Sequence, residues 1–264
     1  MLTFSNYQKA ANLEEAYEWN QKKTSKIIGG MLWMKMENHN IGTVIDLSGL
    51  GLDTIEETEE EFRIGCMVTL RDIETHVGLN EYTNGAVRES VRHIVGVQFR
   101  NVATVGGSVF GRFGFSDVLT MFMALDSYVE LYKGGIVPLR TFAYMEKDND
   151  ILVRLIVKKT PMDVVYMSVR NTKTDFPTIA CAVSKAGDQV TAVIGARPYR
   201  ATAVEDQTGI LKEGITEKSA RAFGDYVSKQ VRTGSNMRGS KEYRSHLIKV
   251  VVRRSLLQLG GGQQ

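Results

Sequence analysis

The sequence is poor in residues whose side chains bind metals. It has only two cysteines, Cys66 and Cys181, and four histidines among 264 residues. Two cysteines alone cannot hold a structural zinc ion or an iron–sulfur cluster, and the histidines are scattered without the spacing of metal ligands. Each cysteine lies in an apolar, strand-like stretch, which favours a buried small side chain. Any redox centre of this chain must therefore be an organic cofactor.

Long apolar runs are absent as well. No stretch is long enough to cross a bilayer, and the first residues lack the basic-then-apolar order of a secretion signal. The hydrophobic content of 43% and charged content of 24% are typical of globular proteins. We therefore expect a cytoplasmic protein with no membrane partner, long enough for one large domain or two ordinary ones.

Neither sign of charge is scarce in the whole chain, but the net charge of +3 is distributed unevenly along it. Residues 1–160 carry a net −4 and residues 161–264 a net +7. A basic half could bind nucleic acid or an acidic protein surface. The basic residues recur at helical spacing without interleaved aromatic residues, however, which favours a solvated helix face and no nucleic-acid partner. Arg253 and Arg254 on this face are a candidate docking surface for a protein.

The most informative stretch is R-N-V-A-T-V-G-G-S at residues 100–108. We interpret it as a β-rich run that enters two glycines and then leads to a helix beginning at Asp117. A second glycine pair, at residues 28–31, follows another short strand. Glycine leaves backbone N–H groups open to an anion, so two converging turns would suit a diphosphate. Glycine pairs alone are weak evidence, because most of them form ordinary turns.

The periodicity of apolar residues predicts an α+β chain. Helices are predicted over residues 13–21, 69–77, 85–94, 117–125, 217–231 and 240–259, and a brief helical turn over 31–36. Strands are predicted over residues 26–28, 43–47, 61–66, 128–132, 136–137 and 151–157, followed by antiparallel strands over 164–169, 178–185 and 189–194. The acidic run 56–61 is interpreted as a solvated hairpin turn, and residues 260–264 as a frayed tail. We place a domain boundary near residue 162, which gives domains 1–161 and 162–264.

These motifs resemble those of the medium, FAD-binding subunit of molybdenum hydroxylases, the family of xanthine dehydrogenase and carbon monoxide dehydrogenase. Residues 26–32 are similar to the first FAD loop of that family, usually A-G-G-T-D-L. Residues 100–108 match its most specific motif, R-N-x-A-T-[IV]-G-G-N. Further similarities lie at Asp117 and at residues 124–131, 166–182, 243–244 and 252–254. The resemblance therefore covers nearly the whole chain, in order and spacing.

The resemblance implies an α+β fold: a PCMH-type (vanillyl-alcohol-oxidase-like) FAD-binding domain of two subdomains, plus a C-terminal α+β domain with an antiparallel sheet and helices. It also implies a redox relay. Substrate would be oxidised on a molybdopterin-binding large subunit, and electrons would pass through the 2Fe–2S clusters of a small subunit to FAD. Reduced FAD would then deliver them to NAD⁺ or another acceptor. The organic substrate is set elsewhere, with a purine or another N-heterocycle as the family-level expectation.

The residues expected to bind FAD follow from matching this chain to the family motifs. They are Ile28, Gly29, Gly30, Met31, Leu32, Thr104, Gly106, Gly107, Ser108, Asp117 and Ile156. Backbone N–H groups of both glycine turns would bind the diphosphate. Asp117 would accept hydrogen bonds from ribityl or ribose hydroxyls, or serve as a helix N-cap. Ile156 would pack near the flavin ring, or belong to an ordinary strand core. No catalytic acid or base and no metal ligand is expected.

Several positions depart from the family pattern. Met31 and Leu32 replace the common Thr and Asp, Ser108 replaces Asn, and residues 111–114 replace a segment of small residues. A rival hypothesis is therefore a non-catalytic assembly subunit of the same complex that has lost FAD binding. A third is an independent flavin oxidoreductase, although the chain has no constellation of His, Tyr or Cys that would face a substrate. Trp33 is interpreted as packing, and the role of Phe113 is left open.

Overall fold

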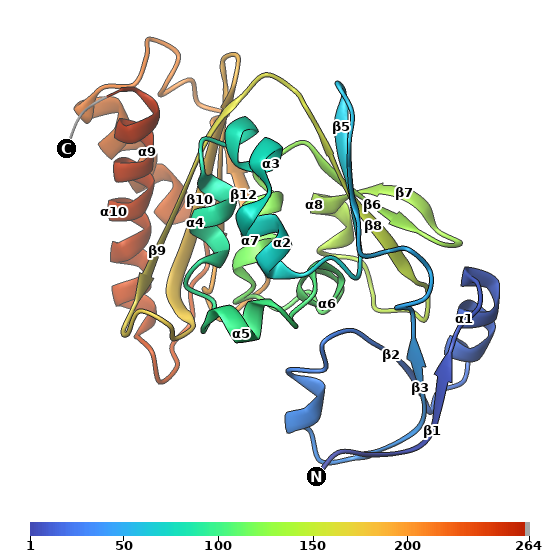
Figure 1. The fold of residues 1–264 in the computed structure, drawn as a ribbon. Coiled ribbons are helices and arrows are strands. Elements are labelled where there is room, and N and C mark those ends of the chain that lie inside the picture. The colour runs from blue at the N-terminus through green and yellow to red at the C-terminus, as the bar shows by residue number, and fades with distance from the viewer. Residues whose placement is uncertain (262–264) are drawn as a thin grey trace.

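The computed structural model describes residues 1–261 and contains three β-sheets arranged along one elongated molecule (Figure 1). A small N-terminal sheet lies at one end of the view, and the two long C-terminal helices lie at the other end. A five-stranded sheet and a cluster of short helices fill the space between them. The predicted tail at residues 260–264 falls partly outside the described residues.

The N-terminal sheet is parallel and has the order β1-β3-β2. Its elements are β1 (Thr3–Lys9), α1 (Leu13–Asn20), β2 (Ser25–Ile28) and β3 (Asn40–Asp46), with a 3-10 turn at Met34–Met36. Asn12 is the N-cap of α1, because its side chain accepts a hydrogen bond from the N–H of Glu15. The sequence did not predict β1, since all seven of its residues are exposed and no apolar alternation marks it.

The second sheet has the order β4-β5-β8-β6-β7. Its strands are β4 (Ile55–Glu57), β5 (Glu61–Gly65), β6 (Ser127–Leu131), β7 (Gly135–Pro138) and β8 (Leu152–Lys158). The acidic run was predicted as a solvated hairpin turn. Residues 56–60 are exposed and the run does turn between two paired strands, but its two ends belong to those strands and Glu61 is buried. Its first residues form β4 paired with β5, and Glu61 is only 6% exposed because Lys158 and Arg63 both donate to its carboxylate.

Short helices lie between this sheet and the C-terminal strands (Figure 1). They are α2 (Leu70–Thr75), α3 (Val77–Tyr82), α4 (Ala86–Val91), α5 (Val97–Arg100), α6 (Val105–Phe110), α7 (Asp117–Phe122) and α8 (Leu139–Phe142). Thr69 and Asp72 form a capping box at the start of α2. The helix predicted to continue to residue 77 instead ends at Thr75, and His76 caps the next helix with its ring nitrogen.

The glycine motif has a different local structure from the predicted one. Helix α5, not a strand, precedes it, and both Gly106 and Gly107 lie inside α6. The helix starts there because the Thr104 side chain accepts the N–H of Gly107, which makes Thr104 the N-cap. A Cβ on Gly106 would lie 2.6 Å from the carbonyl oxygen of Cys66. The glycine therefore allows α6 to approach the end of β5.

The C-terminal sheet is antiparallel, as predicted, with the order β12-β11-β10-β9. Its strands are β9 (Asp163–Arg170), β10 (Pro177–Ala186), β11 (Gln189–Gly195) and β12 (Thr202–Glu205), and it is followed by α9 (Glu217–Gln230) and α10 (Lys241–Leu259). Alternate residues of β10 belong to two different cores. Ile179 and Cys181 pack in the core shared with α9 and α10, whereas Ala180 and Ala182 pack in the core of the N-terminal part. This sheet is thus covered on both faces.

A buried ion pair fixes the start of the glycine motif. The Arg100 guanidinium donates to the Glu74 carboxylate at 2.8 and 3.2 Å, and both side chains are less than 10% exposed. Arg100 also donates to the carbonyl of Ile94. Burial raises the pKa of Glu74, but the hydrogen bonds from Arg100 and Arg71 outweigh it and hold that pKa below its ordinary value. Arg100 therefore positions the motif by joining it to α2.

Replacing Arg100 by methionine should lower the free energy of unfolding by about 2 kcal/mol, because the buried Glu74 carboxylate would keep only Arg71 as a partner. Urea denaturation followed by circular dichroism measures this. The double variant R100M/E74M should recover much of the loss, since it removes both charges. Asp225→Asn, which breaks the exposed Lys249–Asp225 pair, is the matched control and should cost less than about 1 kcal/mol. Equal losses in R100M and D225N would contradict the structural role of Arg100.

Glu61, together with its donors Arg63 and Lys158, should make the stability of the protein sensitive to acid. Hydrogen bonds from Lys158 and Arg63 hold the pKa of Glu61 below its ordinary value of 4.5. A lowered carboxyl pKa contributes stability that is present above the unfolded-state pKa and is lost as the pH falls through the folded-state pKa. The stability of Glu61→Gln should therefore fall less steeply than that of wild type below about pH 5. Glu59→Gln, an exposed change in the same turn, should keep the wild-type slope of urea stability against pH.

Candidate functional site

The two glycine segments meet at the carboxyl end of the parallel sheet. Strand β2 leads directly into Gly29 and Gly30, and the carboxyl edge of a parallel sheet is where such folds bind ligands. A Cβ added to Gly29 would lie 2.6 Å from the Thr104 hydroxyl. A Cβ added to Gly30 would lie 2.0 Å from the carbonyl oxygen of Val102. Only glycine permits this contact, so the two segments touch each other, while their convergence on one ligand stays a prediction.

The first loop presents backbone donors. Within residues 1–261, the N–H groups of Gly30, Met31 and Leu32 donate to no protein acceptor. Met31 has a φ of 56°, a left-handed conformation that non-glycine residues adopt at an energetic cost. Buried or half-buried N–H groups are almost always paired. Three free donors on one strained turn would suit an anion, and residues 29–32 are here called the glycine cradle.

The second glycine pair contributes differently from what the sequence predicts. The N–H of Gly106 donates to the carbonyl of Cys66, that of Gly107 to the Thr104 hydroxyl, and that of Ser108 to the carbonyl of Thr104. These three N–H groups are thus bonded inside the protein. The proton of the Thr104 hydroxyl, beside Gly29, has no acceptor among the described residues and can point to a ligand. Contacts of Gly106, Gly107 and Ser108 with FAD stay a prediction.

Asp117 lies at the seam between the two halves of the chain. Ser116, not Asp117, is the N-cap of α7, and Asp117 is the first helical residue. Its carboxylate accepts hydrogen bonds from the Tyr166 hydroxyl and, at 2.6 Å, from the Arg170 guanidinium. Burial raises the pKa of Asp117, and the Arg170 charge acts against this rise. Arg170 and Tyr166 were not among the predicted site residues, although Tyr166 and Arg170 share one face of β9 by their even spacing.

Ile156 and Arg112 lie in separate surroundings. Ile156 on β8 is 3% exposed and stands opposite Arg63 and Tyr128 in the sheet, so its contact with the flavin stays a prediction. Arg112, which departs from the family pattern, is buried and has a φ of 49°. Its Nε donates to the carbonyl of Phe142, and its guanidinium lies 3.9 Å from the centre of the Phe142 ring. The Arg112 charge is therefore held against α8.

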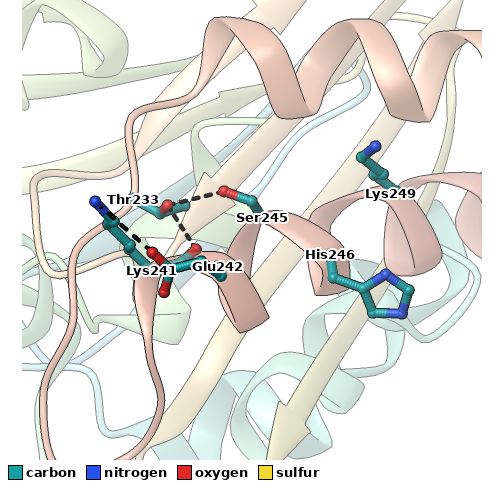
Figure 2. Close-up of a pocket in the computed structure, with 6 residues that line it drawn as sticks. All are labelled: Thr233, Lys241, Glu242, Ser245, His246 and Lys249. Carbon is teal, nitrogen blue, oxygen red and sulfur yellow. Dashed lines mark hydrogen bonds and ion pairs between the residues drawn. The ribbon is translucent and has the colours of Figure 1, made fainter.

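A hollow of about 420 Å³ lies beside α10, and Figure 2 shows its lining. Its residues are Thr233, Lys241, Glu242, Ser245, His246 and Lys249. The Thr233 hydroxyl bonds to Ser245 and to the carbonyl of Lys241, while Lys241 pairs with Glu242. These polar groups are engaged with one another. The hollow contains none of the predicted site residues, and the docking candidate Arg253 on the same helix is paired with Glu217.

The thiols take no part in an exposed site. Cys66 and Cys181 are free and buried, as interpreted from the sequence, and burial raises the pKa of each thiol to about 12. Both are thus protonated and unreactive near neutral pH. In the part of the chain that the structure describes, no helix is long and apolar enough to span a membrane.

Comparison with known sequences identifies the family. The sequence profile of the FAD binding domain in molybdopterin dehydrogenase matches residues 2–159, and that of the CO dehydrogenase flavoprotein C-terminal domain matches residues 165–259. The chain belongs to this FAD-binding family. It is an oxidoreductase subunit, and its cofactor is FAD. The fold class inferred from the resemblance is therefore confirmed.

Two curated relatives match over almost their full length. The nicotine 6-hydroxylase medium subunit of Paenarthrobacter nicotinovorans is 24% identical, with 96% of each chain covered. The xanthine dehydrogenase FAD-binding subunit of Escherichia coli O157:H7 is also 24% identical, with 96% of this chain and 95% of the relative covered. Each of these names describes one subunit of an enzyme.

Solved structures share the fold at lower identity. Quinoline 2-oxidoreductase from Pseudomonas putida 86 superposes with a TM-score of 0.83 at 18% identity, covering 98% of this chain and 97% of that one. Carbon monoxide dehydrogenase from Hydrogenophaga pseudoflava gives 0.83 at 20% identity and 95% coverage of both chains. These similarities establish the arrangement of both halves of the chain.

The glycine cradle fits the diphosphate of FAD. Its free N–H groups at residues 30–32 supply oriented donors without a cationic side chain. Because these donors are backbone groups, the departures at Met31 and Leu32 leave them in place. The free hydroxyl proton of Thr104 adds one more donor beside Gly29. We therefore expect residues 29–32 and Thr104 to hold the diphosphate of the FAD cofactor.

Gly30→Ala should weaken FAD binding at least about tenfold, because its Cβ would displace the cradle from Val102 and misplace donors that bind a charged group. Titration of FAD into the apoprotein, followed by calorimetry, measures the change. Gly96→Ala is the matched control. Its backbone is extended and its added Cβ would meet no atom closer than 3.5 Å, so wild-type affinity is expected. Wild-type affinity in Gly30→Ala would contradict the assignment of the cradle.

Proposed function

We propose that this chain is the electron-transfer subunit of a multi-subunit, molybdenum-dependent dehydrogenase. Electrons from an organic substrate, oxidised on a molybdopterin-binding large subunit, pass through a small 2Fe–2S subunit to FAD on this chain. From FAD the electrons pass to NAD⁺ or to another acceptor. The observation that carries this proposal is the glycine cradle, a set of free backbone donors in a chain that matches medium and FAD-binding subunits over nearly their full length.

The residues of this chain bind and orient the cofactor. When bound, FAD supplies the chemistry, because it accepts electrons singly or in pairs and releases them. The cradle residues Gly30, Met31 and Leu32 would hold the middle of the molecule by its diphosphate. The network of Asp117, Tyr166 and Arg170 holds α7 and β9 together at the seam. No acid or base from the chain is required for such a relay.

We also propose the boundaries and location expected from the sequence. A division near residue 162, giving domains 1–161 and 162–264, falls in the segment between β8 and β9. This segment also lies between the two profile matches, which end at residue 159 and begin at residue 165. A cytoplasmic location suits an NAD⁺-linked relay.

One observation favours a second function. The N–H groups of Gly106, Gly107 and Ser108 are already bonded inside the protein, so one of the two expected donor sets is missing. A subunit that retains the fold for assembly but transfers no electrons would need none of them. The first function remains favoured, because an assembly subunit has no use for the strained turn at Met31 or its free donors.

The proposed relay is tested on the complex purified through a tag on this chain. Its flavin is identified by mass and reduced anaerobically with dithionite, then mixed with NAD⁺ or with ferricyanide. Flavin reoxidation by NAD⁺ would assign a hydride acceptor, and reoxidation by ferricyanide alone would assign a one-electron acceptor; both support the relay. A complex that assembles without flavin and fails to take up added FAD would establish the assembly role instead. The Gly30→Ala complex is the control, and should assemble yet contain little FAD.

A further inference from the structure

Four aromatic rings gather beside the glycine cradle. This aromatic quartet consists of Trp33, Phe113, Phe115 and Phe176. The rings of Phe113 and Phe115 are stacked, with centroids 5.1 Å apart and planes 9° apart. Phe176 lies 4.8 Å from Phe115 and 5.2 Å from Trp33. These distances are those of favourable aromatic contacts, so the quartet is one continuous surface.

The quartet joins three segments that are distant in sequence. Trp33 follows the cradle directly, Phe113 and Phe115 lie between α6 and α7, and Phe176 lies between β9 and β10. The Phe113 ring packs on Gly111, where an added Cβ would come within 2.5 Å of it. The rings therefore stand where the N-terminal loop, the second glycine segment and the C-terminal domain come together.

The quartet is incompletely covered by the rest of the chain. Trp33 is 41% exposed and Phe113 is 39% exposed. The neighbouring Met36 is 73% exposed as well. Large aromatic side chains that pack only with one another are usually buried, and a continuous exposed apolar surface marks a ligand or partner site. A flat apolar ligand would cover such a surface well.

Two cationic side chains lie against rings of the quartet. The Arg238 guanidinium lies 4.8 Å from the centre of the Phe176 ring, and the Lys147 ammonium lies 5.4 Å from that of Phe113. Arg238 is held in place by Asp175, whose backbone carbonyl also accepts a hydrogen bond from Arg170. Positive charge beside a ring surface suits a planar ligand that gains negative charge on reduction. This is the behaviour of a flavin ring.

We propose that the aromatic quartet is the surface on which the isoalloxazine ring of FAD rests, with Trp33 and Phe113 in contact with the ring. The inference rests on the FAD-binding role of the cradle. In FAD, a ribityl chain joins the isoalloxazine to the diphosphate, so a diphosphate held at residues 30–32 would leave the ring within reach of the neighbouring quartet. The aromatic residues that depart from the family pattern thus become positioning residues for the flavin.

The test uses the two tryptophans of the full-length chain. Indole in contact with a flavin quenches flavin fluorescence, whereas phenylalanine quenches it little. FAD bound to wild type should therefore be strongly quenched, and Trp33→Phe, which keeps an aromatic ring at this position, should raise the emission of its bound FAD several-fold. Trp19→Phe is the matched control, because Trp19 lies in α1 outside the quartet, and its bound FAD should stay quenched. Phe113→Leu should leave the emission low but weaken FAD affinity about fivefold.

The outcomes separate this inference from the proposed function. Bound FAD that is equally quenched in wild type and Trp33→Phe, at equal affinity, would overturn the contact with Trp33 and leave the relay standing. A wild-type chain that binds no FAD would refute both. ADP is used to test the other end of the cofactor. If Trp33→Ala weakened ADP binding as much as FAD binding, Trp33 would contact the adenosine diphosphate portion, and the inference would be wrong.

Discussion

The structure depends on the absence of side chains at two adjacent positions. The carbonyl of Val102 and the hydroxyl of Thr104 occupy the space where Gly30 and Gly29 would carry a Cβ. This contact joins the end of β2 to the segment that starts α6. Gly106 then brings α6 against Cys66, at the end of β5. Two sheets that share no hydrogen-bonded strand are thereby connected through glycine contacts, and the free donors of the cradle lie at that connection.

Two buried ion pairs fix the positions of the neighbouring elements. Arg100 ties the glycine motif to α2 through Glu74, and Arg170 ties β9 to α7 through Asp117. A buried ion pair contributes little net stability over an apolar packing, but separating its partners is costly. Such pairs therefore favour one arrangement over others. In this chain the charged residues of the recognised motifs position the backbone, and the backbone would supply the donors proposed for the ligand.

Much of the fold followed from the sequence, and the errors have physical causes. Helix α10 and strands β9–β11 were predicted closely, because their apolar residues recur with clear periodicity and Gly187 marks the turn. Strand β1 has no buried face, so it had no pattern to detect. The N–H of Gly106 is engaged by Cys66, which is distant in sequence, whereas those of Gly107 and Ser108 are engaged by Thr104, the N-cap of α6. The network of Asp117, Tyr166 and Arg170 likewise depends on how two domains pack, which local patterns do not encode.

Recognition through backbone donors also explains how the chain can depart from its family and keep a cofactor site. An N–H group presents the same donor whether the residue is Thr or Met, so the changes at Met31 and Leu32 alter only what the side chains touch. The glycines are different, because any Cβ at Gly30 collides with Val102. Substitutions in this loop are therefore tolerated only where the side chain points away from the contact. Trp33 directly follows these loop residues, and its side chain adds an aromatic surface without disturbing the donors.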